Sequence, residues 1–354
     1  MGPRKRWAAV FALALGLAYW PLSRSLEPAL REAWFTMVTR ALVTDARALA
    51  PPAGKMWLGA SRPELPQSLY GIYELESKLR KPLAIASFYQ AWGDGPEHAF
   101  PLQVMRSLDS GGYLPMLTWE PWLSAFARHR GQSPRAALRL IADGQLDAYV
   151  RTWARGAVRY GKPFLLRPGH EPSNPWYGWA PEHGNSAADY RAFWARVHRI
   201  FREEGARNAL FVWTPYGLSD HAFFPGAARV DWIGFDIFNY GGLSEQGTWL
   251  DFYTLTKLYY DAYRDLGPRL LIAEAGTTSA GGNKADWIRD MFHSLARANF
   301  PEIRALVLFD HPSGRTAAGL PVDWSLGEAA ESYAMLLRQP ALLASFTRER
   351  RTQP

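Results

Sequence analysis

An alternation of short apolar runs with longer helical stretches begins at Lys55 and constrains the fold more than any other feature of the sequence. The runs are Met56–Gly59, Leu83–Phe88, Tyr113–Trp119, Phe164–Arg167, Leu210–Thr214, Trp232–Asp236, Leu270–Glu274 and Leu306–Asp310. Eight strand–helix units in one chain are typical of a (β/α)8 TIM barrel, an α/β fold in which parallel strands close into a cylinder covered by helices. We therefore expect a TIM barrel.

Helical patterns fill most of the gaps between these runs. They are Asp147–Tyr160, Ala187–Glu204, Leu250–Asp265, Ala285–Ala298 and Glu328–Leu337. The gap after the fifth run is short, so a loop containing Phe223–Gly226 is expected in place of a full helix. A doubly wound open sheet would carry a glycine-rich phosphate turn after its first strand. Neither G-x-G-x-x-G nor a P-loop occurs, which favours the barrel.

The start of the chain has the pattern of an export signal. A basic stretch, Gly2–Arg6, precedes the apolar stretch Trp7–Trp20, and no small-x-small cleavage site follows. We predict a signal peptide or signal anchor over 1–23, a helical stalk or linker over 24–54, the (β/α)8 barrel domain over 55–340 and a basic tail over 341–354. The expected location is the periplasmic face of the inner membrane, or outside the cell after secretion.

Charge and composition exclude several classes of protein. The net charge is +7, but most of the excess lies at Arg4–Arg6 and in the tail, so a nucleic-acid-binding face is not expected. The chain has no cysteine, and its eight histidines lack short metal-ligand spacing. We expect no metal, no cofactor, membrane contact only through the N-terminal segment, and a monomer.

One segment, residues 167–179, combines Arg167, His170 and Glu171 with three aromatic rings directly after an apolar strand. Sugar rings stack on flat aromatic faces, while an acid protonates the bond to be broken. In TIM barrels, residues at the C-terminal ends of the strands form the active site. Glu274 ends the seventh run in the same way, and a pair of carboxylates is the minimum needed to hydrolyse a glycoside. A buried salt bridge to an arginine is the competing interpretation of Glu274.

The chain resembles glycoside hydrolase family 26, the β-mannanase family of a large clan of retaining (β/α)8 glycosidases. That family's acid/base motif has the form R-x-x-H-E-x-N-G-x-W-Y-x-W, and residues 167–179 match its Arg, His, Glu, Trp, Tyr and Trp. The segments that agree with the family are Pro115–Trp122, Phe224–Gly226, Val230–Asp236, Leu271–Gly276 and Asp323–Trp324. The resemblance covers nearly all of the predicted barrel.

The resemblance implies that Glu171 is the general acid/base, that Glu274 is the nucleophile, and that His170 forms a hydrogen bond near the substrate or the nucleophile. An acid kept protonated by its apolar setting would donate to the leaving oxygen, and a carboxylate kept ionised by Arg167 or other donors would attack the anomeric carbon. Two carboxyl groups roughly 5–5.5 Å apart would give retention of configuration.

Two departures from the family pattern concern the site. The family's Asn-Gly is here Ser173-Asn174, in a loop that contacts substrate. The tyrosine that usually donates to the nucleophile from the sixth strand is replaced by Phe238, and Tyr240 could substitute for it. Further candidates for sugar contact, besides Arg167, are Trp119, Glu120, Trp122, Trp176, Trp179, Asp236 and Tyr240. Asp310 and His311 could line the floor of the site or form structural hydrogen bonds.

Three functions are compatible with these residues. The first is a retaining β-glycoside hydrolase, endo-acting on β-1,4-mannan or a related β-glucan, with a β-linked polysaccharide or oligosaccharide as substrate. The second is a barrel that binds polysaccharide with little or no cleavage during exopolysaccharide assembly or export. The third is an enzyme that trims a polymer made by its own host.

Overall fold

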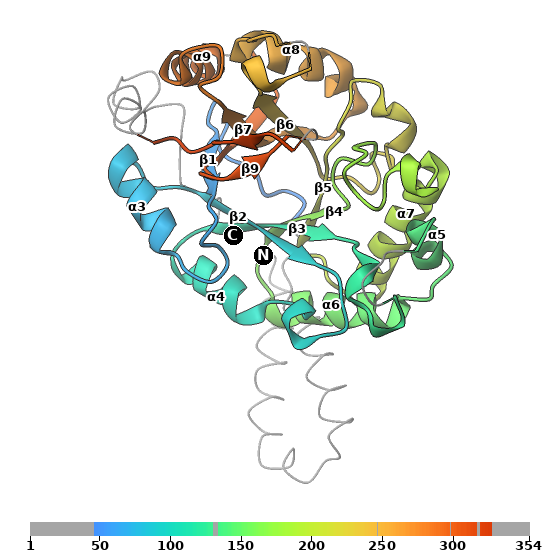
Figure 1. Ribbon diagram of the computed structural model, residues 1–354. Coiled ribbons are helices and arrows are strands. Elements are labelled where there is room, and N and C mark those ends of the chain that lie inside the picture. Colours follow the sequence, from blue (N-terminus) through green and yellow to red (C-terminus); the bar gives the residue numbers. More distant parts are fainter. Residues whose placement is uncertain (1–45, 130–133, 246, 298, 317–318, 328–354) are drawn as a thin grey trace, which may run out of the picture.

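The protein is a closed barrel of eight parallel strands in the order β1 to β8, as the computed structural model shows (Figure 1). The structure describes residues 46–129, 134–245, 247–297, 299–316 and 319–327. The strands are β1 Trp57–Ser61, β2 Ile85–Ala91, β3 Leu114–Glu120, β4 Phe164–Pro168, β5 Ala209–Trp213, β6 Trp232–Asn239, β7 Arg269–Thr277 and β8 Ile303–Phe309. The predicted TIM barrel is confirmed.

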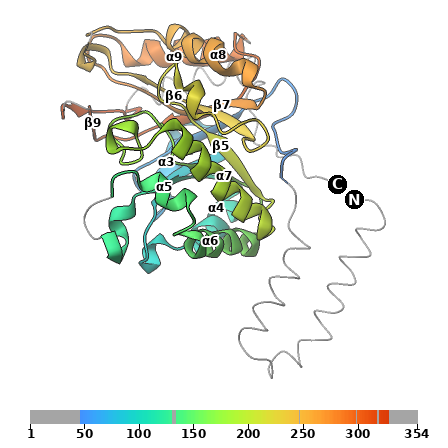
Figure 2. The same ribbon diagram turned by 90° about the vertical axis from the view of Figure 1, so that its right-hand side faces the viewer.

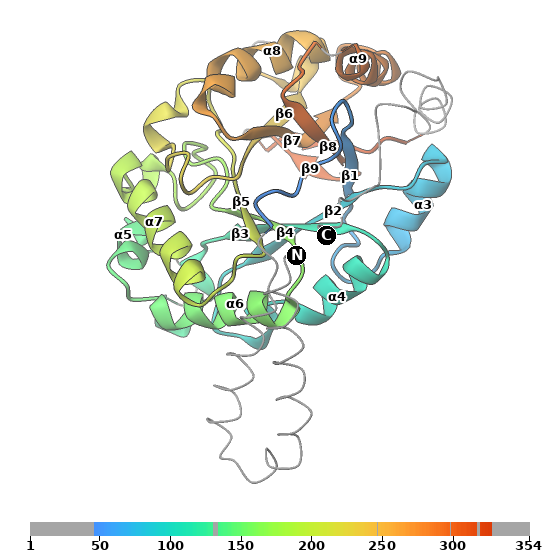
Figure 3. The same ribbon diagram turned by 180° about the vertical axis from the view of Figure 1, so that it is seen from behind.

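Helices form an outer layer around these strands (Figures 2 and 3). They are α3 Tyr70–Leu79, α4 Leu102–Ser110, α5 Ala137–Ala142, α6 Asp147–Tyr160, α7 Ala187–Glu203, α8 Phe252–Tyr263 and α9 Lys284–Ala296. Between β5 and β6 the only helical element is the short 3-10 turn Asp220–Phe223, as the sequence predicted. The hairpin of β9 Gly314–Arg315 and β10 Pro321–Val322, which the sequence did not predict, lies beyond β8.

Local sequence explains where the longer helices begin. The Ser186 hydroxyl accepts from the amide of Asp189, and the Asp189 carboxylate accepts from the amide of Ser186, which forms a capping box at the start of α7. Asp251 and Asn283 cap α8 and α9 by accepting from an amide three residues on. Each cap satisfies an amide that has no partner within its helix, so each fixes the first residue of that helix.

Side chains alternate between two apolar layers because successive strand residues point to opposite faces of the sheet. In β3, Leu114 and Met116 belong to the barrel interior, whereas Leu117 and Trp119 pack outward under the helices. This alternation decides which side chains at the strand ends can reach the mouth of the barrel.

Residues 46–54 lie against the N-terminal end of the barrel. Ala46 and Leu49 join the interior cluster, and the Arg304 guanidinium donates to the carbonyls of Pro51 (2.8 Å) and Pro52 (2.7 Å). The part of the predicted stalk that the structure describes is therefore packed on the barrel and contains turns instead of helix.

Several predictions lie outside the described residues. These are the signal or anchor segment 1–23, most of the stalk, the closing helix 328–337 and the basic tail 341–354. Among the residues that are described, no helix has the length and apolar character needed to cross a membrane.

Candidate active site

The end of β4 turns sharply and delivers Glu171 to the mouth of the barrel. Gly169 has φ +56°, and Glu171 itself has φ +49°, a left-handed conformation that is uncommon for a residue with a side chain. The Glu171 amide donates to the carbonyl of Thr214 at the end of β5 (2.9 Å). Strained residues of this kind are concentrated at functional sites, and this one sets the direction of the predicted acid.

Arg167 lies at the centre of the site and is fully buried. Its guanidinium donates to the Thr118 hydroxyl (2.9 Å), to both oxygens of Asp236 (2.9 and 3.0 Å) and to the Glu274 carboxylate. The side chain has 0% exposure. We predicted that Arg167 and Asp236 contact the sugar. Instead, the two side chains form a buried ion pair with each other, and Arg167 also holds the Glu274 carboxylate. Burial raises the pKa of Asp236, and Arg167 opposes that shift.

Glu274 points into the barrel because of a bulge in β7. Phe235 pairs with Ile272, but the next residue, Asp236, pairs with Glu274, so Ala273 is an extra residue in β7. Strict alternation would place Glu274 on the outer face together with Ile272, and the bulge turns its side chain inward. Inside, it accepts hydrogen bonds from Arg167 and from the hydroxyl of Tyr89.

Tyr89 is a candidate site residue that the sequence did not predict. It comes from β2, where alternation from the interior residue Ile85 places it inside, but the predicted second run ended one residue earlier at Phe88. Its hydroxyl donates to the predicted nucleophile. Phe238 packs against Trp324 with ring centroids 4.9 Å apart, and Tyr240 meets the same indole edge-on. The donor expected from β6 is therefore supplied by β2.

Glu171 carries the properties of a general acid. Burial raises its pKa to about 7, which is partly opposed by a hydrogen bond from the Asn174 amide (2.7 Å). A carboxyl with this pKa is protonated for much of the time near neutral pH. Asn174 belongs to the Ser173-Asn174 pair that departs from the family motif, so the departure places an amide on the acid itself.

His170 contacts Tyr177, and no hydrogen bond joins it to either of the predicted catalytic carboxylates in the described structure. Its Nε2 lies 2.8 Å from the Tyr177 hydroxyl. Burial first, and then Arg167, hold the pKa of His170 well below its usual value, so the ring is neutral. Trp179 stacks on Tyr177 at 4.4 Å and donates to the His170 carbonyl (2.8 Å).

Two of the four predicted tryptophan platforms have no free face. Trp179 is 1% exposed and packs against the loop that follows β4 and carries the motif, which is called the motif loop below. Trp119 is fully buried and stacks on Trp153 of α6 at 4.4 Å. The reason is strand alternation, because its neighbour Thr118 points inward to Arg167 and Trp119 must therefore point outward. Both predictions of sugar contact were wrong.

The other predicted contacts remain accessible. Trp176 is 61% exposed on the motif loop, and Trp122 is half-buried with its ring edge-on to Trp179 at 5.0 Å. Glu120 ends β3, and burial raises the pKa of its carboxyl to about 7. These three side chains can still meet a sugar at the mouth.

Asp310 and His311 have structural partners. Asp310 accepts from the Arg62 guanidinium and from the Leu326 amide (2.8 Å). His311 lies 3.0 Å from the Ser61 hydroxyl and stacks on Phe309 at 4.1 Å. Of the two alternatives, structural hydrogen bonding describes both residues.

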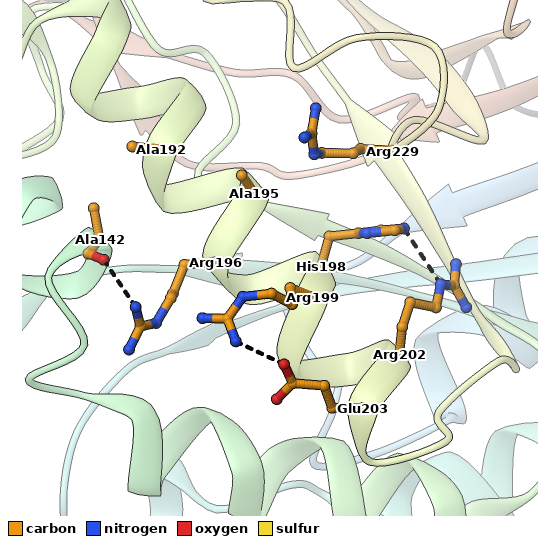
Figure 4. Close-up of a pocket in the computed structure, with 9 residues that line it drawn as sticks. All are labelled: Ala142, Ala192, Ala195, Arg196, His198, Arg199, Arg202, Glu203 and Arg229. Carbon is orange, nitrogen blue, oxygen red and sulfur yellow. Dashed lines mark hydrogen bonds and ion pairs between the residues drawn. The ribbon is translucent and has the colours of Figure 1, made fainter.

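A cavity of about 610 Å³ lies away from this site, on the outer face of α7 (Figure 4). Arginines line it, and three of them form ion pairs: Arg196 with Asp147, Arg199 with Glu203 and Arg202 with Asp231. Exposed pairs of this kind contribute little to stability and are common on solvated surfaces. The two predicted catalytic carboxylates lie at the strand ends and not in this cavity. No group of three or more potential metal ligands occurs among the described residues.

Comparison with known proteins identifies the barrel. Residues 134–287, which contain both Glu171 and Glu274, match the model of glycosyl hydrolase family 26. The resemblance to family 26 is confirmed. Endoglucanase H of Acetivibrio thermocellus is 30% identical over 235 residues, which are 64% of this chain and 24% of that protein. A β-1,3-xylanase of a Vibrio species is 27% identical over 131 residues, 34% of this chain and 27% of that protein. The chain thus spans about a quarter of the length of these relatives.

Solved structures share the fold of this barrel. A modular endo-β-1,4-mannanase from Cellulomonas fimi matches with a TM-score of 0.62 at 16% identity, covering 86% of this chain and 76% of that one. The YdhT protein of Bacillus subtilis matches with a TM-score of 0.58 at 16% identity, covering 86% and 90%. These two solved structures share the fold of this chain.

Proposed function

We propose that this chain is a retaining β-glycoside hydrolase that acts by double displacement with Glu274 as nucleophile and Glu171 as acid/base. The observation that carries the proposal is the contrast between the two carboxyls. Glu274 accepts hydrogen bonds from a guanidinium and a phenol, whereas burial raises the pKa of Glu171 to about 7. One attacking carboxylate and one proton donor are what the two steps require.

In the first step, Glu274 attacks the anomeric carbon, and Glu171 gives its proton to the oxygen of the departing sugar. Glu171 is then a carboxylate that the Asn174 amide stabilises. In the second step, it removes a proton from water, and the water oxygen displaces Glu274 from the sugar. Glu171 regains its proton, and the product keeps the β configuration.

The substrate that we propose is a β-linked glucan or a β-1,4-mannan cleaved within the chain. The similarity to an endoglucanase supports a glucan, and the shared fold with mannanases is compatible with a mannan. We further propose that the protein is exported, on the basis of the basic and apolar stretches before residue 24.

A panel of polysaccharides tests the proposal. We expect purified protein to release reducing ends from β-1,4-mannan or mixed-linkage β-glucan, and proton NMR during the reaction to show the β-anomer of the product first. β-1,3-glucan and β-xylan complete the panel. Binding to these polymers without any release of reducing ends would instead favour the non-catalytic barrel, and an α-anomer formed first would exclude double displacement.

The pH profile reports on Glu171. Because the acid must be protonated, kcat/KM should fall as pH rises through about 7. Asn174→Ala removes a donor that stabilises the carboxylate, so the pKa of Glu171 should rise and the alkaline limb should move to higher pH. Ser173→Ala, at the neighbouring position, is the matched control and should leave the limb in place. An alkaline limb that is identical in Asn174→Ala and wild type would mean that Glu171 does not set it.

A further inference from the structure

The loop that follows β5 is held rigidly by hydrogen bonds to its backbone. The Asp220 carboxylate accepts from the amides of Tyr216 (2.8 Å) and Gly217 (3.1 Å). On the other side, the Tyr259 hydroxyl donates to the Tyr216 carbonyl (2.6 Å), and the Tyr263 hydroxyl donates to the Gly217 carbonyl. Two helix tyrosines and one carboxylate thus fix the backbone that carries Tyr216.

The side chains of this fixed loop are nevertheless exposed. Tyr216 and Leu218 are each 42% exposed. Large apolar side chains on an ordered loop at the C-terminal face of a TIM barrel are typical of binding surfaces. Because the loop is already ordered without a ligand, binding would not have to supply the free energy needed to order it.

Tyr216 lies on the same side of the mouth as the proton donor. The carbonyl of Thr214 accepts from the Glu171 amide (2.9 Å), and a Cβ built on Gly217 would lie 3.9 Å from the Ser173 hydroxyl. Burial, and next the Glu171 carboxylate, raise the pKa of Tyr216. Because Glu171 protonates the oxygen of the leaving sugar, the leaving part of the chain must lie on this side.

We infer that Tyr216 forms a sugar-stacking platform for the leaving part of a polysaccharide. The sugar that stacks on Tyr216 would lie farther from the cleaved bond than a sugar that contacts Trp176. The inference rests on the proposed function. Trp176 is 61% exposed on the loop after β4, so the loops after β4 and β5 each carry an exposed ring. Stacking on a C–H face of a sugar needs the ring and not the hydroxyl. The platform favours substrates that continue past the cleaved bond over short glycosides.

Kinetics on two classes of substrate test the inference. For Tyr216→Ala, kcat/KM on β-linked oligosaccharides with at least two sugars on the leaving side should fall roughly tenfold, the size of a lost aromatic contact. Hydrolysis of a nitrophenyl β-glycoside, which has no leaving sugar, should change less than twofold. Tyr216→Phe should retain wild-type rates on both. Tyr73→Ala is the matched control, since Tyr73 is 50% exposed on α3 and outside the site.

Two results would overturn the inference while leaving the proposed function intact. One is unchanged hydrolysis of the long oligosaccharides by Tyr216→Ala. The other is an equal loss on the nitrophenyl glycoside, which would indicate that the loop supports Glu171 structurally. If wild type cleaves no glycan, the proposed function fails separately. Calorimetric titration with the same oligosaccharides then tests the platform by itself. If Tyr216 forms it, Tyr216→Ala must bind them more weakly than wild type.

Discussion

Glu274→Gln should lower kcat/KM on the preferred polysaccharide by roughly 10⁴-fold or more, because an amide cannot form the covalent intermediate. The side-chain oxygen of a glutamine can still accept hydrogen bonds from Arg167 and Tyr89, so the fold should be kept. Glu302→Gln, an exposed carboxyl before β8, is the matched control and should retain full activity. Far-UV circular dichroism of each variant checks the fold.

Comparison with Glu171→Gln separates the two roles. A nitrophenyl leaving group needs little protonation, so Glu171→Gln should still release nitrophenol in a fast first step. Glu274→Gln should be inactive on both substrate classes. Tyr89→Phe removes one donor from the nucleophile and should cost about 10–10²-fold. Full activity in Glu274→Gln would exclude this residue as the nucleophile, and full activity in Tyr89→Phe would show that its hydroxyl is dispensable.

Arg167→Met should lower the free energy of unfolding by about 3–5 kcal/mol at neutral pH. The substitution leaves the carboxylates of Asp236 and Glu274 buried without their cation, which is costlier than the loss of an exposed ion pair. Arg139→Met is the matched control, since Arg139 is 59% exposed in its pair with Asp189, and it should leave the free energy of unfolding nearly unchanged. Urea denaturation measures both.

The pH dependence of this deficit gives a second readout. Burial raises the folded-state pKa of Asp236, and loss of the Arg167 guanidinium that opposes this shift should raise that pKa further. A raised pKa contributes stability below the unfolded pKa and loses it as pH rises through the folded one. The deficit of Arg167→Met relative to wild type should therefore shrink as the pH is lowered toward 4. A deficit that is small at neutral pH would show that the ion pairs contribute little.

Much of the architecture could be predicted because its cause is local. The apolar runs specify strands, and all eight occur within a few residues of the predicted positions. The motif from Arg167 to Trp179 predicted the acid because its residues lie on one strand and the loop that follows. Strand alternation could also have identified Tyr89 as interior and Trp119 as exterior, had each strand been followed to its last residue.

The sequence by itself determined the barrel, the position of Glu171 and the presence of a second carboxyl on β7. Only the tertiary structure decided what these residues contact. The bulge at Ala273 turned Glu274 inward, since the register of β7 depends on how β6 and β8 pair with it. Closure of the barrel brought Tyr89 next to the Glu274 carboxylate. It also buried Arg167 between Asp236 and Glu274, the two carboxylates to which it donates hydrogen bonds. Such contacts join residues far apart in the chain, and no local pattern encodes them.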